Sequence, residues 1–327
     1  MHPGSVPSSA PSASSGARPD SPDGGAGTTD HGARRSDRDR RVGRRRPTRT
    51  AFVGRRATPT VRKFSPEYLR RTRDGMWAES REALADLSLA DRTRVLDAGC
   101  GTGELSRVLD AETPGEVVCV DADTDLLGVA RRETGLSTVA GDAVRLPFVD
   151  DAFDLVVCQA LLVNLPDPSE ALDSFVRVSS ELVAAVEPDN AAVGVESTVS
   201  AEVALERSVR ESYIEGVRTD VALGDRLPDI FEAAGLRDVR TRRHFHRKVT
   251  QPPYDELELE DAARKANGAG VAAHETELRR TLSDAEYDAL RRDWREMGRS
   301  VVEQMREERY RRAEVVPFDV VVGRVPE

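Results

Sequence analysis

The feature of this chain that most constrains its fold is a short apolar run that leads directly into a glycine-rich loop. Residues 95–98 (VLDA) have the composition of a buried strand, and residues 99–103 (GCGTG) follow at once. Residues 104–109 (ELSRVL) then have the composition of the first turns of a helix. A strand, a glycine loop and a helix in this order predict a nucleotide site, because glycine reaches positive φ and lets a ligand touch the main chain.

The spacing of the glycines narrows the ligand class. The dinucleotide fingerprint G-x-G-x-x-G requires a third glycine at position 104, where this chain has Glu104. Acidic side chains stand at both ends of the loop, Asp97 and Glu104, and they disfavour a pyrophosphate. The loop therefore favours a nucleoside that carries an amino acid, with its ammonium group, over a dinucleotide.

The run VLDAGCGTG over residues 95–103 resembles the first motif of class I S-adenosylmethionine (SAM)-dependent methyltransferases, in particular the small-molecule enzymes of type 11. The alternative is a strand–turn–helix whose glycines serve only the turn. The resemblance implies SAM as the cofactor. It also implies that the first motif binds SAM through Asp97, Gly99, Cys100, Gly101, Thr102 and Gly103.

Two further segments match the same family. Asp121 ends an apolar strand about 20 residues after the glycine loop, where a carboxylate can accept hydrogen bonds from both ribose hydroxyls. A helix N-cap is the alternative role for Asp121 or Asp123. The family's element that meets adenine corresponds to residues 141–143 (GDA), for which an aspartate in a turn is the alternative. The further residues expected to bind cofactor are Asp121, Ala122, Asp142, Ala143 and Gln159.

The sequence gives fewer indications of the residues that contact the methyl acceptor. Asn164 follows the fourth strand, where small-molecule members of the family often have histidine, and an amide cannot take a proton at neutral pH. No catalytic residue is therefore predicted. The residues expected to contact substrate are Tyr68, Asn164, Glu187 and Tyr213. His244 and His246 share one strand face, but no third ligand lies nearby in the sequence, so no metal is predicted.

From residue 94 onward strand and helix patterns alternate, which predicts parallel strands joined by crossover helices. The expected fold is α/β, a doubly wound, mostly parallel, seven-stranded sheet of the class I methyltransferase type. Its last strand is expected to be antiparallel and inserted beside the fifth. The expected domains are a SAM-binding methyltransferase domain over residues 61–250, a helical insertion or cap over 251–312, and the last strand over 313–327.

The predicted insertion contains a long helix that begins with a capping box formed by Ser283 and Glu286. This helix has one apolar face, which includes Trp294 and Met297. Such a face must be covered. If the N-terminal helices of the main domain cover it, the insertion is a cap beside the active site. If a second subunit covers it, the insertion is a dimerisation arm. The cap is the favoured interpretation.

The first 60 residues are rich in arginine and poor in large apolar side chains, which predicts a disordered tail. Residues 1–56 contain 12 arginines and 5 aspartates, although the whole chain has a net charge of −10. This segment is a candidate arm for RNA. The favoured alternatives are a solvated tail and a gene start placed too far upstream.

The three cysteines lie in or beside apolar strands and form no C-x-x-C pair, and the sequence has no secretory signal and no apolar run of membrane-spanning length. These features predict a cytoplasmic protein without membrane association. The leading predicted function is SAM-dependent methyl transfer to a small-molecule acceptor. The alternatives are an RNA or protein methyltransferase recruited through the basic tail, and a SAM-binding module without turnover.

Deletion of residues 1–56 is expected to leave the melting temperature and the affinity for SAM unchanged. The reason is that this segment offers little apolar surface for packing. Thermal melts and calorimetric titrations of the full-length and truncated chains measure both quantities. A drop of several degrees on truncation would contradict the expectation, because it would show that the segment packs on the rest of the chain.

Overall fold

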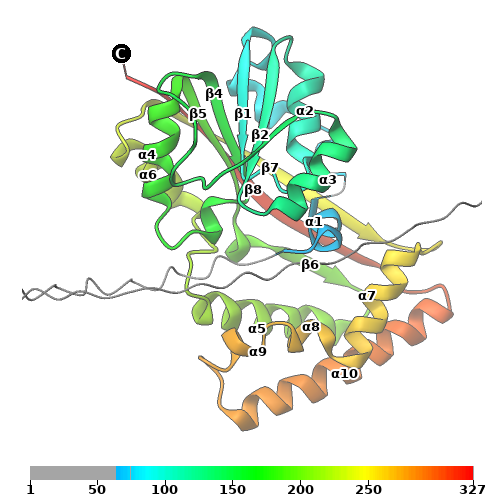
Figure 1. Ribbon diagram of the computed structural model, residues 1–327. Coiled ribbons are helices and arrows are strands. Elements are labelled where there is room, and N and C mark those ends of the chain that lie inside the picture. Colours follow the sequence, from blue (N-terminus) through cyan, green and yellow to red (C-terminus); the bar gives the residue numbers. More distant parts are fainter. Residues whose placement is uncertain (1–63, 74, 327) are drawn as a thin grey trace, which may run out of the picture. The chain divides into compact units, whose positions relative to one another are not determined.

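The computed structural model describes residues 64–73 and 75–326 (Figure 1). The whole of the tail predicted over residues 1–60 therefore lies outside the described residues. The strands are β1 (Arg94–Ala98), β2 (Glu116–Asp121), β3 (Ser137–Ala140), β4 (Phe153–Gln159), β5 (Ser179–Pro188), β6 (Gly194–Ser197), β7 (Arg237–Thr250) and β8 (Arg312–Arg324). The α-helices are α1 (Pro66–Arg73), α2 (Glu104–Glu112), α3 (Thr124–Thr134), α4 (Pro168–Val178), α5 (Ser200–Gly216), α6 (Leu227–Ala233), α7 (Glu256–Asn267), α8 (Ala269–Ala272), α9 (Glu275–Leu278) and α10 (Asp284–Arg306).

One sheet organises the described part of the chain. Its order is β3-β2-β1-β4-β5-β8-β6, and β7 pairs with β8 as well. Strands β1 to β5 pair in parallel, with Asp97 opposite both Cys119 and Val157. Strand β8 is antiparallel to β5, β6 and β7. The predicted doubly wound α/β fold is confirmed, including an antiparallel last strand beside β5.

The sheet has eight strands among the described residues, whereas the sequence predicted seven. The additional strand β6 has only four residues and pairs with the first residues of β8. Its sequence GVES is too short to show an alternating pattern, which is why the sequence gives no indication of it. Before β1, helix α1 ends at Arg73 and a 3-10 helix (Glu82–Leu87) follows it.

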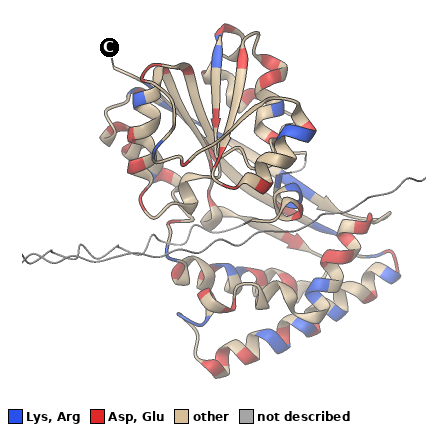
Figure 2. Ribbon diagram, viewed as in Figure 1, with Lys and Arg blue, Asp and Glu red and all other residues tan. Residues whose placement is uncertain are grey.

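Apolar side chains cover both faces of the central strands. On one face Leu96 belongs to a cluster with Phe175 of α4 and Phe231 of α6. On the other face Val95 belongs to a cluster with Leu109 of α2. Neighbouring residues of β1 thus point into opposite layers, as the pleat of a strand requires. Figure 2 shows Lys, Arg, Asp and Glu on helices and strand ends, with the middle of the central strands almost free of them. Among the described helices, none has the length and apolarity needed to span a bilayer.

Helices α5 and α7 to α10 form a separate layer next to the sheet (Figure 1). Helix α10 begins with the capping box that the sequence predicted, formed by Ser283 and Glu286. Its apolar face buries Trp294 and Met297 in a cluster with side chains of α5, α7, α8 and α9. Within the chain, helices of the same layer cover this face, whereas the sequence analysis named the N-terminal helices or a second subunit as its cover.

Candidate active site

The glycine loop lies at the carboxyl end of β1, which is flanked by β2 and β4 in the sheet. This position is the topological switch point, where the order of the strands reverses. Gly99, Gly101 and Gly103 have φ values of 72°, 56° and 88°, which glycine adopts without strain. A Cβ atom on Gly99 would lie 2.9 Å from the Leu161 side chain, and one on Gly103 would lie 2.8 Å from that of Thr134. Backbone conformation and close packing together require glycine in this loop.

Asp121, at the end of β2, holds the glycine loop in place. Its Oδ2 accepts a hydrogen bond from the Gly101 amide at 2.8 Å, and its Oδ1 accepts one from the Asp123 amide at 2.8 Å. Each oxygen keeps further acceptor capacity. Burial raises the pKa of Asp121. The N-cap role that was the alternative belongs to Asp123, whose side chain accepts the amides of Asp125 and Leu126 at the start of α3.

A cavity of about 320 Å³ lies beside this loop, and we call it the loop cavity. Four of the residues expected to bind cofactor line it: Gly99, Gly101, Asp121 and Ala122. Leu69 and Arg73 of α1 form part of its wall. Of the two, Arg73 is a site residue that the sequence analysis missed. The available indication was its position four residues after Leu69, which places both side chains on one face of α1.

Three other residues expected to bind cofactor have their side chains turned elsewhere. Gln159 accepts a hydrogen bond from Trp77 Nε1 at 3.4 Å and donates one to Met76 Sδ at 3.1 Å. Asp142 accepts the Val144 amide at 3.1 Å, which is the turn role that was its alternative. Ala143 packs against the core. Gln159 and Ala143 thus have structural contacts that the sequence analysis did not predict, whereas the contact of Asp142 is the alternative that it gave.

The remaining residues of the first motif are buried at the loop itself: Cys100, Thr102 and Gly103. The Thr102 hydroxyl donates to Glu104 Oε2 at 2.6 Å. This contact occupies the Glu104 carboxylate, which also pairs with Arg107. Of the two acids that bracket the loop, Asp97 is the one with a buried oxygen that has no hydrogen-bond partner among the described residues.

Asp97 is 1% exposed and lies at the end of β1. Its Oδ2 accepts the Ser106 hydroxyl at 2.5 Å, while its buried Oδ1 has no hydrogen-bond partner among the described residues. Burial raises the pKa of Asp97 to about 7, although the Ser106 hydrogen bond acts in the opposite direction. A buried acceptor without a partner next to the loop fits a donor supplied by a ligand.

The titration of Asp97 predicts a pH dependence of stability. Its pKa is about 7 in the folded chain against a reference of 3.8, so between these values the folded state binds a proton that the unfolded state has lost. The contribution of this group to the free energy of unfolding is therefore full below about pH 4 and is lost as the pH rises towards 7. Asp97→Asn cannot titrate and is expected to flatten the profile, as measured by urea denaturation across this window. Parallel wild-type and Asp97→Asn profiles would contradict the expectation.

A second cavity of about 450 Å³, which we call the cap cavity, lies between the carboxyl ends of β4 and β5 and the helical layer. Three of the four residues expected to contact substrate line it: Tyr68, Asn164 and Tyr213. From the helical layer it is lined by His274, whose ring meets that of Tyr213 edge-on at 4.8 Å, and by Trp294. Residues that are far apart in the sequence thus form one partly aromatic wall.

The fourth of these residues, Glu187, has a different position from the expected one. It is 1% exposed, and its carboxylate accepts the amides of Leu161, Leu162 and Val163 at 3.0, 2.9 and 3.3 Å. Burial raises its pKa to about 7, against the effect of these amide donors. Glu187 therefore positions the turn after β4, which carries Asn164, and the prediction that it contacts substrate is corrected.

The loop cavity and the cap cavity meet. They share five lining residues: Phe64, Leu69, Arg73, Ala160 and Asn164. Ala160 has a φ of 49°, an unusual value for a residue with a Cβ, and such strain often accompanies functional sites. The side-chain amide of Asn164 donates to the backbone carbonyl of Ala160 at 2.8 Å, and the guanidinium of Arg73 donates to the backbone carbonyl of Gln159 at 3.4 Å. The cavity beside the glycine loop and the cavity beside the helical layer therefore share one wall.

Comparison with known proteins finds similarity over part of the chain. Residues 96–181, from β1 to the start of β5, match the family described as a methyltransferase domain. The chain contains a class I methyltransferase-like domain. The matched residues of this methyltransferase domain include the whole glycine loop, Asp121 and Asn164.

The relatives of the methyltransferase domain include demethylmenaquinone methyltransferases. The protein of that name from Lactiplantibacillus plantarum is 36% identical over 107 residues, which are 30% of this chain and 45% of that protein. The one from Staphylococcus aureus (strain JH9) is 34% identical over 104 residues, 30% of this chain and 43% of that protein. The chain thus spans less than half the length of these relatives. A solved structure of phosphoethanolamine N-methyltransferase 2 from Haemonchus contortus, in complex with SAM, is 17% identical with a TM-score of 0.40, covering 80% of this chain and 60% of that one.

Proposed function

We propose that this chain transfers a methyl group from SAM to a small-molecule acceptor. The observation that carries the proposal is the wall that the two cavities share, which we call the junction and which includes Ala160 and Asn164. A group-transfer enzyme needs its two ligands held next to each other in defined cavities, because alignment of the reacting atoms supplies much of the rate enhancement.

The residues of the loop cavity fit SAM. Gly99 and Gly101 let a ligand approach the backbone, and Asp121 has acceptor capacity for ribose hydroxyls. The unpartnered Oδ1 of Asp97 suits an ammonium group, and Arg73 supplies a cation for a carboxylate. When bound, SAM supplies a methyl group on a positively charged sulfur, which is already a good leaving group.

In such a reaction the role of the protein is to align the two ligands and to exclude water. Leu69 and Phe64 line both cavities and give the junction apolar walls. Arg73 and Asn164, the polar residues shared by the two cavities, cannot accept a proton at neutral pH. The junction therefore suits an acceptor atom that attacks without a protein base, and we assign no catalytic residue.

The cap cavity supports a small acceptor over RNA or protein. Its volume of about 450 Å³ lies in the range of small-ligand pockets, and helices of the same chain border it. The names of the curated relatives also specify a small acceptor, demethylmenaquinone. We further propose a cytoplasmic location, because Cys100, Cys119 and Cys158 are all buried free thiols.

Calorimetric titration with S-adenosylhomocysteine, the demethylated product of SAM, tests the cofactor half of the proposal. We expect saturable heat with one site per chain, and competition by SAM. An absence of heat in both low and high salt would contradict the proposal.

A further inference from the structure

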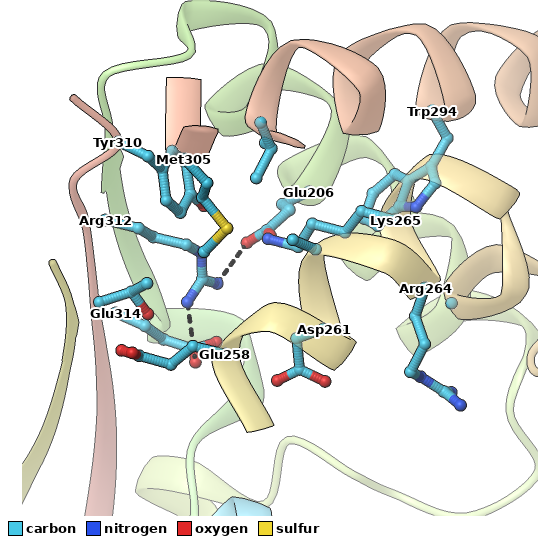
Figure 3. Close-up of a pocket in the computed structure, with 14 residues that line it drawn as sticks. Glu206, Glu258, Asp261, Arg264, Lys265, Trp294, Met305, Tyr310, Arg312 and Glu314 are labelled. Atoms are coloured by element: carbon cyan, nitrogen blue, oxygen red, sulfur yellow. Dashed lines mark hydrogen bonds and ion pairs between the residues drawn. The ribbon is translucent and has the colours of Figure 1, made fainter. Parts of the chain in front are cut away.

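The carboxylates on the wall of the cap cavity are neutralised by basic side chains of the same chain. Glu206 accepts Lys265 Nζ at 2.9 Å and Arg312 Nη2 at 2.7 Å, and Glu314 lies 3.4 Å from Arg312 Nη1 (Figure 3). Burial alone would raise the pKa of Glu206, but the charges of Lys265 and Arg312 bring it to about 2. Glu206 and Glu314 therefore offer little to a cationic acceptor.

Arg210 presents the opposite situation. It is half-buried on α5 and lines the cap cavity one turn from both Glu206 and Tyr213. No acidic side chain among residues 64–73 and 75–326 pairs with its guanidinium. The cap cavity has four basic residues on its wall (Arg73, Arg210, Lys248 and Arg312) against the two paired glutamates. This local excess of positive charge contrasts with the net charge of −10 of the whole chain.

A second polar group on this wall also lacks a partner. Trp294 is 7% exposed, and its indole Nε1 is buried without a hydrogen-bond acceptor in the described part of the chain. Leaving a buried donor unpaired is unfavourable, so the site fits a ligand that brings an acceptor oxygen. Trp294 lines both the cap cavity and the charged pocket of Figure 3, which places it beside the Glu206–Lys265–Arg312 group.

Apart from Thr72, Asn164, Asn190 and His274, the rest of the cap cavity wall is apolar or aromatic. Its wall includes Tyr68, Val163, Val209, Tyr213, Val316 and Phe318. Such a surface favours a flat apolar body over a sugar or a free amino acid, because it cannot satisfy many hydroxyls. Arg73 is already assigned to the carboxylate of the cofactor, so Arg210 is the remaining guanidinium of this wall without an acidic partner among the described residues. It matches one planar, singly charged carboxylate, to which arginine can donate two parallel hydrogen bonds.

We propose that the acceptor is an apolar, ring-containing carboxylate, bound through its carboxylate by Arg210 with Trp294 Nε1 as an additional donor. The proposal rests on the proposed function, since it names the acceptor class of the same site. It makes Arg210 a substrate-binding residue that distinguishes anionic acceptors from neutral and cationic ones of the same shape.

Three naphthalene derivatives of one shape test the proposal: naphthoate, naphthamide and naphthylmethylammonium. They are titrated calorimetrically into the full chain saturated with S-adenosylhomocysteine. We expect naphthoate to bind at least about tenfold more tightly than naphthamide, the effect of a charge-assisted hydrogen bond, and the ammonium to bind most weakly. Arg210→Gln is expected to abolish the preference, and Arg210→Lys to retain part of it.

Arg207→Gln is the matched control, because Arg207 is exposed on the same helix and does not line the cap cavity. It is expected to keep the wild-type preference. Equal binding of naphthoate and naphthamide, tighter binding of the ammonium, no binding of any of the three at millimolar concentration, or an unchanged preference in Arg210→Gln would each overturn the proposal. If naphthoate selectivity through Arg210 is found but S-adenosylhomocysteine does not bind, the proposed function fails and the anion site stands.

Discussion

Replacing Glu202 by alanine is expected to lower the free energy of unfolding by about 3 kcal/mol, the lower end of what breaking a buried ion pair costs. Glu202 is fully buried on α5. Its carboxylate accepts Lys265 Nζ, and both of its oxygens accept the Tyr310 hydroxyl at 2.9 Å. The alanine variant leaves these donors in the interior without their acceptor. The lower end of the range applies because Glu206 still pairs with Lys265.

Urea denaturation of wild type and Glu202→Ala measures this difference. Glu211→Ala is the matched control, since Glu211 is exposed on the same helix and is expected to change stability by less than about 0.5 kcal/mol. A loss in Glu202→Ala no larger than that of the control would contradict the structure of this charged group. The expected loss would show that the group anchors the helical layer that borders the cap cavity.

Replacing Asp121 by alanine is expected to weaken binding of S-adenosylhomocysteine by about 1.5–3 kcal/mol, the range for hydrogen bonds to a charged group. The variant removes the proposed acceptor of the ribose hydroxyls. It also removes the partner of the Gly101 amide, which fixes the glycine loop. Calorimetry measures the affinity, and circular dichroism checks that the variant is folded.

Asp110→Ala serves as the control for loss of one negative charge, because Asp110 is exposed on α2 and does not line the loop cavity. It is expected to bind with wild-type affinity. Equal affinities of Asp121→Ala and wild type would remove Asp121 from the site and, with it, the strongest link between the second strand and the cofactor.

The parts of the fold that the sequence predicted are those governed by local patterns. Buried parallel strands appear as continuous apolar runs, and the glycine loop and the Ser283–Glu286 capping box depend on residues within a few positions of each other. Strand β6 was not predicted, because four residues are too few to show a periodic pattern. The helices that cover the apolar face of α10 were not predicted either. An amphipathic pattern shows that a face is buried, but it does not show which element buries it.

The residues of the candidate site were predicted only in part, for a similar reason. Motif residues identify which backbone segments reach the carboxyl edge of the sheet, but the direction of a side chain there depends on tertiary packing. Glu187 ends at that edge and yet turns inward to bind the amides after β4. Arg73 and Trp294 reach the cavities from helices whose positions no local pattern specifies.

The measurement that tests the central claim most directly is methyl transfer itself. The full chain is incubated with SAM labelled in its methyl group and with a cell extract that is then fractionated into RNA, protein and small metabolites. We expect label in the small-metabolite fraction, strongly reduced when Asp121→Ala replaces the wild type. Label confined to RNA or protein, or no incorporation above the level of the Asp121→Ala variant, would contradict the assignment of this chain as a small-molecule methyltransferase.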